Sequence, residues 1–251
     1  MANKNYLYGR YAFRTDVGKV RLQNEDQACA LTNAQGNILL VVCDGMGGMN
    51  KGDLASATAV DYIVDCFKAK DKFLNSFFAR RWVMKTLKEA NNRIFRMASG
   101  NDKYQGMGTT VTLVLIVNDY MVVAQVGDSR AYSFRNRILD QITEDQTYVQ
   151  YLYRVGKISK EEIATHPKRH VLMNALGIYP SLDMDIKVMP YMNDTIMLCS
   201  DGLYNNVSER DLFSIIKGSD SPDQKVHELI SLANNNGGSD NIAVVVWEAR
   251  S

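Results

Sequence analysis

The chain has 251 residues, of which 46% are hydrophobic and 23% are charged. Its 29 Lys and Arg residues nearly balance its 28 Asp and Glu residues, which leaves a net charge of +1. This composition is that of a soluble globular protein with one sizeable core. Because the near-neutral balance comes without blocks of Lys and Arg, it argues against a nucleic-acid binder and against a polybasic membrane module. We therefore expect neither nucleic acid nor a membrane among the partners.

The N-terminal residues 1–13 are polar and rich in tyrosine, without the apolar segment of about 7 to 15 residues that a secretory signal requires. The longest apolar runs, at 38–43, 111–117 and 242–247, are far shorter than the roughly 18 residues of a membrane span. The four cysteines are isolated and form no CxxC pair. We expect a cytoplasmic protein without a disulfide framework.

Apolar runs rich in β-branched residues predict strands, because they have the length of strands and are separated by turn residues such as Asn118 and Asn136. These runs lie at 27–32, 38–43, 109–117, 120–126, 131–135, 138–143, 195–200 and 242–248. The sequence therefore predicts a sheet-rich protein with several hairpins.

Two helical patterns interrupt the strands between Gly52 and Ala98. The expected apolar face of the second helix consists of Phe78, Trp82, Leu87, Ala90, Ile94 and Met97. Because the two patterns are consecutive, we expect them to pair as a helical hairpin. Near the C-terminus, Ser208 and Ser221 are expected to cap two further helices, the second with Pro222 at its first position.

The order of these elements differs from the regular β-α-β alternation of a parallel sheet, since strands lie at both ends of the chain with helix pairs between them. We therefore predict an α+β fold with antiparallel layers and a single domain over residues 1–251. The least regular segment is 144–181, with short helical pieces at 148–155 and 160–164. It is interpreted either as a mobile flap or, by default, as a solvated excursion.

Acidic residues stand at the ends of predicted strands in four places. Asp44 and Asp201 each follow a buried run and precede a glycine, while Asp128 follows a strand and Asp240 precedes one. Carboxylates at the rim of a sheet can converge from distant sequence positions, and they repel one another unless a cation is present. Oxygen ligands without Cys or His suit Mg²⁺ or Mn²⁺. Taken singly, each acidic residue is explained better by a hairpin turn than by a metal ligand, and only the four together favour a metal site.

Glycines at 45, 47 and 48 follow Asp44 in a segment longer than a two-residue turn needs. They would let backbone carbonyls approach a metal closely. The segment does not fit a phosphate loop, which requires Gly-Lys-Ser/Thr after its spacer. It does not fit the dinucleotide fingerprint either, because the third glycine would fall at Asn50.

Upstream, Arg21 precedes the carboxylates of Glu25 and Asp26 by four and five residues. A guanidinium in this position either binds a phosphate with two parallel hydrogen bonds or forms a surface salt bridge of little energy. From the residues around Arg21 alone, the surface salt bridge is the preferred interpretation.

Seven motifs occur along the chain in a fixed order. They are Arg21 with Asn24-Glu25-Asp26, Asp44-Gly45-Met46-Gly47-Gly48, Gly108-Thr109-Thr110, Gly127-Asp128-Ser129-Arg130, His166-Pro167 leading to Ala175-Leu176-Gly177, Ser200-Asp201-Gly202-Leu203, and Gly238-Ser239-Asp240-Asn241. In this order they resemble the metal-dependent protein phosphatases of the PPM family, type 2C. The resemblance extends from about Arg10 to Glu248, and without extra domains the chain is similar to the compact bacterial branch.

The resemblance implies an α/β/β/α sandwich of two antiparallel sheets flanked by helix pairs, with two Mn²⁺ or Mg²⁺ ions at one end. It implies that Asp44 bridges both metals and that the Gly45 carbonyl binds one of them. Asp201 and Asp240 would hold the other. These three aspartates, together with Arg21, are the expected catalytic residues.

Further positions match the family's site. Asp128 together with Asp201 resembles the pair that holds a third, weaker metal in bacterial members. Glu25 and Asp26 match the acidic pair near the centre, as ligands or through water, and Arg21 matches the phosphate-binding arginine.

The chain also departs from the family pattern. Eukaryotic members carry at Met46 a histidine that is proposed as a general acid, and bacterial relatives commonly have methionine there. Many bacterial members have His at Met49 and Glu at Asp53, and their flap usually opens with Asp-His-Ser where this chain has Asp145-Gln146-Thr147. We expect these departures to affect substrate preference more than the metal centre.

The resemblance predicts a protein serine/threonine phosphatase in which a hydroxide bridging the two metals attacks phosphorus directly. Arg21 would neutralise the phosphate oxygens. Because Met46 cannot donate a proton to the leaving alkoxide, we hypothesise that a water on the third metal, held by Asp128, is the acid. Phosphorylated proteins are the expected substrates, with an opposing Ser/Thr kinase in signalling and a monomeric enzyme.

Two alternatives stay open, a catalytically weak metal-binding relative that acts through partner recognition and a binding module with a structural cation. Intact ligand positions favour the phosphatase, and Arg21 argues against the structural cation. His166, His170 and His227 are interpreted as flap or surface residues. Cys43 is interpreted as a core residue, because the Cys-x₅-Arg spacing of thiol phosphatases is missing.

Overall fold

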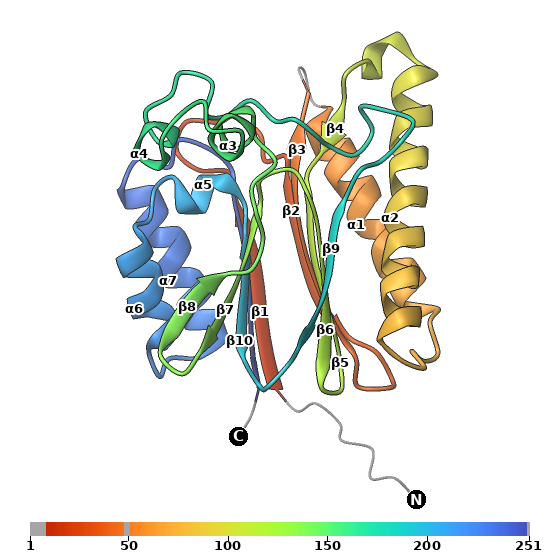
Figure 1. The fold of residues 1–251 in the computed structure, drawn as a ribbon, viewed down its shortest axis with the longest axis vertical. Helices are drawn as coiled ribbons and strands as arrows, with labels where there is room; N and C mark the ends of the chain where they lie inside the picture. The colour runs from red at the N-terminus through yellow and green to blue at the C-terminus, as the bar shows by residue number, and fades with distance from the viewer. Residues whose placement is uncertain (1–8, 48–50, 250–251) are drawn as a thin grey trace, which may run out of the picture.

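The computed structural model describes residues 9–47 and 51–249, which form two antiparallel sheets packed face to face and covered by helices on their outer faces (Figure 1). The strands of the first sheet are β1 (Gly9–Asp16), β7 (Arg130–Arg135), β8 (Ile138–Gln141), β10 (Thr195–Cys199) and β11 (Ile242–Ala249), in the order β1-β11-β10-β7-β8. The strands of the second are β2 (Asp26–Thr32), β3 (Ile38–Met46), β5 (Val111–Val117), β6 (Tyr120–Val126) and β9 (Asp185–Pro190), in the order β2-β3-β5-β6-β9, and the short β4 (Gly108–Thr109) pairs with β3.

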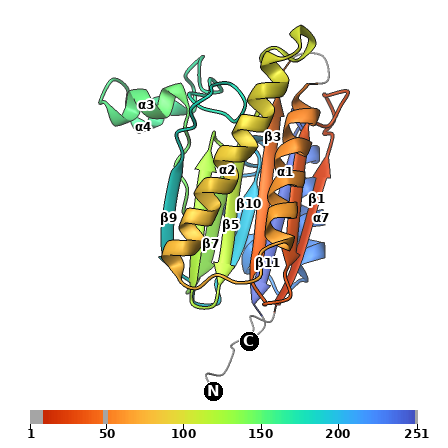
Figure 2. The same ribbon diagram turned by 90° about the vertical axis from the view of Figure 1, so that its right-hand side faces the viewer.

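Helices α1 (Gly52–Lys68) and α2 (Ser76–Ser99) cover the second sheet and pack on each other as the predicted hairpin (Figure 2). The first sheet is covered by α6 (Glu209–Lys217) and α7 (Pro222–Asn235), with the single turn α5 (Asp201–Tyr204) beside them. The predicted α/β/β/α sandwich is confirmed. No helix in the described part of the chain combines the length and the apolar character needed to cross a membrane.

The long apolar runs are explained by burial on both faces of a strand. In β3, Ile38 and Val42 belong to the core between the sheets, whereas Leu39 and Val41 pack under α1 and α2. Successive side chains of a strand point to opposite faces, so a strand between two cores needs apolar residues at every position. Strand β11 repeats this pattern on the other sheet.

Two strands, β1 and β9, were not predicted from the sequence. Each lies at the edge of its sheet, and most of its residues are partly or fully exposed. Edge strands carry polar residues that discourage further pairing, so the apolar pattern is missing. The predicted run 109–117 is also divided, because Thr110 separates β4 from β5.

The segment between β8 and β9 rises above one end of the sandwich and carries α3 (Tyr148–Arg154) and α4 (Lys160–Ile163), close to the helical pieces predicted there (Figure 1). We call residues 144–181 the flap. It returns to the sheets through an isolated bridge between Leu176 and Thr109. The flap therefore sits over the strand ends that carry the predicted carboxylates.

Candidate metal centre and active site

A cavity of about 1310 Å³ opens where the flap meets the ends of both sheets. Every predicted site residue except Asp26 lines this catalytic cavity, namely Arg21, Glu25, Asp44, Gly45, Asp128, Asp201 and Asp240. Residues from distant parts of the sequence thus converge as the strand-end pattern predicted. Gly48, Met49 and Asn50 lie outside the described residues.

Asp26 lies beneath the catalytic cavity, opposite Asp44 in the β2–β3 ladder. It is 1% exposed, and its Oδ2 accepts a hydrogen bond from Ser200 Oγ at 2.6 Å, while its Oδ1 has no partner. Burial, and next the repulsion by Asp201, raise the pKa of Asp26 to about 8. The carboxylate is thus held under the other acids without a balancing positive charge.

Asp44 is fixed by the backbone around Thr110. Its N–H donates to Thr110 Oγ1 at 2.9 Å, and its carbonyl accepts from the Thr110 N–H at 2.8 Å. Asp44 lies within β3 rather than after it, because β4 pairs with the strand beyond this point. Loss of water, followed by repulsion from Asp26 and Asp201, raises the pKa of Asp44 well above its ordinary value.

Gly45 and Glu25 join β3 to the start of α1. The Gly45 N–H donates to the Glu25 carbonyl at 3.1 Å, and Glu25 Oε1 accepts from the Gly52 N–H at 3.1 Å. A Cβ on Gly45 would collide with the Gly52 carbonyl, so only glycine fits this close approach of two backbones. The Glu25 carboxylate therefore stands at the first turn of a helix, where the backbone favours an anion.

Asp201 follows β10 and Asp240 precedes β11, and the antiparallel pairing of these strands brings both residues to the same end of the sheet. Asp201 opens α5, and burial, followed by repulsion from Asp240, raises its pKa to about 6. Asp240 Oδ2 accepts from Arg21 Nη2 at 2.8 Å. This ion pair joins residues far apart in sequence, and Arg21 keeps about half of its side chain exposed at the mouth of the catalytic cavity. Arg21 does not form an ion pair with Glu25 or Asp26, the two nearby acids that the surface salt-bridge interpretation named as its partners.

Asp128 lies between β6 and β7 and is 6% exposed. Burial, and then repulsion by Asp201, raise its pKa to about 7. The next cation, Arg130, is already engaged, since its Nη2 lies 2.7 Å from Asp145 Oδ2 and its guanidinium stacks on Tyr204 at 3.6 Å. Arg130 therefore offers little charge compensation to Asp128.

Several residues of the site have roles that the sequence did not indicate. Arg130 and Asp145 gave no hint of their pairing, because they come from different elements. His170 lies on the flap and is exposed, as interpreted from the sequence, but it also lines the catalytic cavity, with its Nδ1 3.8 Å from Asp201 Oδ2. Asn241 stood within a recognised motif, and its side chain accepts from the Glu25 N–H at 2.9 Å and donates to the Gln23 carbonyl at 2.8 Å. Asn241 thus fixes the loop that carries Arg21.

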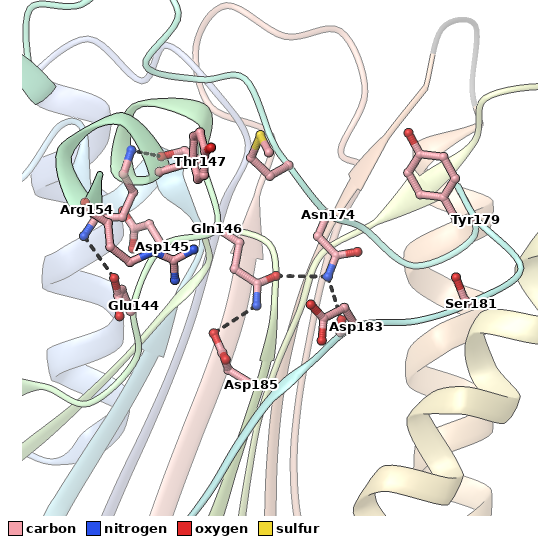
Figure 3. Close-up of a pocket in the computed structure, with 13 residues that line it drawn as sticks. Glu144, Asp145, Gln146, Thr147, Arg154, Asn174, Tyr179, Ser181, Asp183 and Asp185 are labelled. Atoms are coloured by element: carbon pink, nitrogen blue, oxygen red, sulfur yellow. Dashed lines mark hydrogen bonds between the residues drawn. The ribbon is translucent and has the colours of Figure 1, made fainter. Parts of the chain in front are cut away.

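Beside the catalytic cavity lies a second cavity of about 400 Å³ between the flap and β9, and the two share Asp145, Thr147 and Gln150 (Figure 3). Gln146 crosses its floor: Oε1 accepts from Asn174 Nδ2 at 3.2 Å, and Nε2 donates to Asp185 Oδ2 at 3.1 Å. Gln146, one of the departures from the family pattern, therefore ties the flap to β9.

The donor set fits divalent cations. The carboxylates that line the catalytic cavity repel one another, Arg21 is the cation that directly compensates them through Asp240, and one buried oxygen of Asp26 has no partner. All-oxygen donors of this kind suit Mg²⁺ or Mn²⁺. In the described residues no three His, Cys, Asp or Glu side chains are close enough to hold an ion by themselves. Backbone carbonyls and water would have to complete the coordination, which is how Mg²⁺ is commonly bound.

Cys43 is not a nucleophile candidate. It is fully buried in the core under α1, and burial raises the pKa of its thiol far above the ordinary value. A thiol phosphatase needs an exposed cysteine of low pKa. The interpretation of Cys43 as a core residue is consistent with this burial.

Known proteins resemble this chain along most of its length. The family model of protein phosphatase 2C matches residues 19–226. The serine/threonine phosphatase stp of Listeria monocytogenes is 39% identical over 237 residues, which cover 94% of each chain. The protein phosphatase PhpP of Streptococcus pneumoniae is 31% identical and covers 92% of this chain and 94% of its own.

Solved structures agree with the sequence comparisons. The serine/threonine phosphatase Stp1 from Staphylococcus aureus superposes with a TM-score of 0.91 at 31% identity, covering 97% of this chain and 96% of that chain. The catalytic domain of the serine threonine protein phosphatase PstP, in complex with two manganese ions, gives 0.86 at 30% identity over 98% and 100%. The chain therefore belongs to the protein phosphatase 2C family and is a metal-dependent serine/threonine phosphatase of the bacterial type. The predictions of family, fold and activity are confirmed.

Proposed function

We propose that the catalytic cavity removes phosphate from phosphoserine and phosphothreonine in proteins, with two Mn²⁺ or Mg²⁺ ions held by Asp44, the Gly45 carbonyl, Asp201 and Asp240. The observation that carries this assignment is the convergence of the three acids Asp44, Asp201 and Asp240 from three chain segments beside Arg21. The two manganese ions bound by the PstP catalytic domain support it. Bound in this cavity, the cations would lower the pKa of water and neutralise phosphate charge.

Arg21 binds the phosphate in this proposal. Its guanidinium is held at the mouth of the catalytic cavity by Asp240, and Asn241 anchors the loop on which it stands. A charge that is fixed before the reaction stabilises the transition state without reorganisation. Arg21 therefore acts on the oxygens of phosphate while Asp240 keeps it in place.

Glu25 and Asp26 act at different depths. Glu25 lines the catalytic cavity and is positioned by the Gly52 N–H, so it contributes as a ligand or through water. Asp26 lies below and contacts Ser200, so it acts on the centre through its negative charge and the water around Asp44. The two adjacent acids thus have separate roles.

The leaving alkoxide needs a proton, and Met46 has none to give. We assign proton delivery to Asp128. Together with Asp201 it would hold a third ion, and the proton would come through water at that position. Asp128 lines the catalytic cavity and has no cation of its own, since Arg130 is paired with Asp145.

The flap and its cavity receive the polypeptide around the phosphorylated residue in this proposal. In this proposal the whole chain acts as one monomeric catalytic domain. A Ser/Thr kinase supplies its substrates in a signalling pathway. The four free cysteines are compatible with a reducing cytoplasm.

The test is phosphate release from a phosphothreonine peptide with Mn²⁺, with chelator, and with the variant Asp201→Asn. Asp140→Asn, which changes an exposed aspartate on β8 outside both cavities, is the matched control. We expect turnover that requires metal, is lost in Asp201→Asn and is retained in the control. Metal-independent turnover, or equal activity of both variants, would contradict the assignment.

A further inference from the structure

The end of the sandwich opposite the flap carries a concentration of positive charge. We call residues 68–88 the basic end. They comprise the last residue of α1, the connection between the two helices and the first half of α2. The basic end contains one acid, Asp71, and seven basic residues, Lys68, Lys70, Lys72, Arg80, Arg81, Lys85 and Lys88. This segment has a net charge of +6, and since the whole chain carries +1, the rest of the chain carries −5.

Bulky apolar side chains project from the same segment. Leu74 is 68% exposed, Phe77 64% and Phe78 46%, whereas Phe73 is buried and packs edge-on against Trp82 at 5.3 Å. Phe78 was expected on the apolar face of the second helix, and its exposure corrects that prediction. Phe73 anchors the connection, so the other three side chains are held outward by a fixed backbone.

Helix stability does not account for these residues. Asn75 caps α2 by accepting from the Phe78 N–H at 3.2 Å, but the first turn contains no acid, and Arg80 and Arg81 follow it directly. Helix N-termini favour anions and disfavour cations. None of the seven basic side chains takes part in an ion pair within residues 9–47 and 51–249. Cations placed near a helix N-terminus without acidic partners in the fold are unfavourable for the helix, and such an exception points to an external partner.

We propose that the basic end docks on the anionic surface of a lipid bilayer. Lys and Arg are attracted to acidic headgroups, while exposed Phe and Leu side chains bury themselves at the boundary between headgroups and acyl chains. An acidic protein would satisfy the charge, but three adjacent apolar side chains standing out beside cations suit insertion into lipid. This proposal departs from the expectation of no membrane partner, which rested on the charge balance of the whole chain.

The position of the surface suits an enzyme that works beside a membrane. The connection between α1 and α2 lies at the end of the sandwich away from the flap, so the catalytic cavity would face outward from the bilayer (Figures 1 and 2). Without a second anchor such as an acyl chain, the binding is reversible. This surface is separate from the proposed active site.

The test is sedimentation of the full chain with vesicles of phosphatidylcholine alone and with about a third of phosphatidylglycerol. We expect binding to the anionic vesicles only, weakened by salt. The variants Arg80→Glu with Arg81→Glu, and Leu74→Ser with Phe77→Ser, should each lower the partition coefficient by at least about tenfold. The control Lys187→Glu with Met192→Ser replaces one exposed cation and one exposed apolar side chain outside residues 68–88 and should bind normally.

Hydrolysis of a small aryl phosphate by each variant verifies that it is folded. Absence of binding to anionic vesicles at low salt would overturn the proposal, as would equal loss in the control. Equal binding to neutral vesicles would also overturn it. Concentration-dependent dimerisation that Phe77→Ser abolishes, without lipid binding, would assign the surface to a second copy of the chain instead.

Discussion

The two ends of the sandwich carry opposite charge and hold it in different ways. At the flap end, the acids Asp44, Asp128 and Asp201 converge in one cavity, and burial with mutual repulsion raises their pKa values. At the basic end, Arg80 and Arg81 stand exposed on the surface of a helix without ion-pair partners in the described chain.

The two ends need different kinds of counter-charge. Buried charges of one sign interact strongly because little water screens them, so the flap end needs cations at defined positions. Exposed charges are screened by salt within about 8 to 10 Å, so the basic end needs only a broad surface of opposite charge. A substitution at the flap end should therefore affect chemistry and stability, and one at the basic end only association.

The largest effect is expected for Asp44→Asn. Because Asp44 would contact both cations in the proposed centre, its loss should lower kcat/KM on a phosphopeptide by roughly 10³-fold or more. Steady-state kinetics with Asp140→Asn, an exposed aspartate on β8, as the control would measure the difference. A loss below tenfold would show that Asp44 does not hold the centre.

The next effect is expected for Arg21→Ala, at about 10²-fold in kcat/KM, because the fixed guanidinium acts mainly in the transition state. Arg21→Lys should recover only part of this loss, since an ammonium cannot form two parallel bonds to phosphate. Arg10→Ala, on the exposed side of β1, is the control. Equal activity of Arg21→Ala and the control would reduce Arg21 to a surface ion pair.

A differential effect is expected for Asp128→Ala. Its rate on a phosphothreonine peptide should fall by about tenfold more than its rate on an aryl phosphate, because a phenolate leaves without the proton that an alkoxide needs. The ratio of the two rates is the measurement. Equal losses on both substrates would remove Asp128 from proton delivery.

Stability should depend on pH when metal is removed. An Asp of the unfolded chain loses its proton near pH 4, whereas in the folded protein the pKa of Asp26 is raised to about 8 and that of Asp128 to about 7. Between these values the folded state binds more protons, so its free energy of unfolding falls as pH rises.

Thermal unfolding in chelator at pH 5 and pH 8 checks this prediction. We expect Tm to fall by about 5 °C or more with rising pH, and Mn²⁺ to restore it. In Asp44→Asn the fall should be smaller, because one repelling carboxylate is gone. A Tm in chelator that rises over this pH range would contradict the prediction.

The smallest effect is expected at the basic end. Arg80→Glu with Arg81→Glu should change kcat/KM on an aryl phosphate by no more than about twofold, because the two arginines are exposed and screened from the catalytic cavity. A loss approaching that of Arg21→Ala would mean that the two ends are coupled.

The buried strands and the meeting of the acids in one cavity were predictable from the sequence for one physical reason. Strands between two cores need continuous apolar runs, and acids placed at their ends must meet at the rim, as Asp128 and Asp240 do. Edge strands such as β1 lack this pattern. The sequence also did not show that Asp26 is buried below the cavity. Adjacent side chains point in different directions, and in the fold Asp26 contacts Ser200 while Glu25 lines the cavity.

Long-range side-chain pairs were beyond the sequence altogether. Arg130 and Asp145 carry no local pattern that connects them, yet they neutralise each other beside the acids. The basic end was missed for a related reason. Its cations are spaced along a helix and a connection rather than placed in a block, and whole-chain neutrality conceals them.

The central claim is that the converging carboxylates hold divalent cations, and calorimetric titration of Mn²⁺ into the metal-free chain tests it most directly. We predict two tight sites in the original chain, with both weakened in Asp44→Asn and one weakened in Asp240→Asn. Unchanged Mn²⁺ binding in both variants would contradict the account, because the cations would then lie elsewhere.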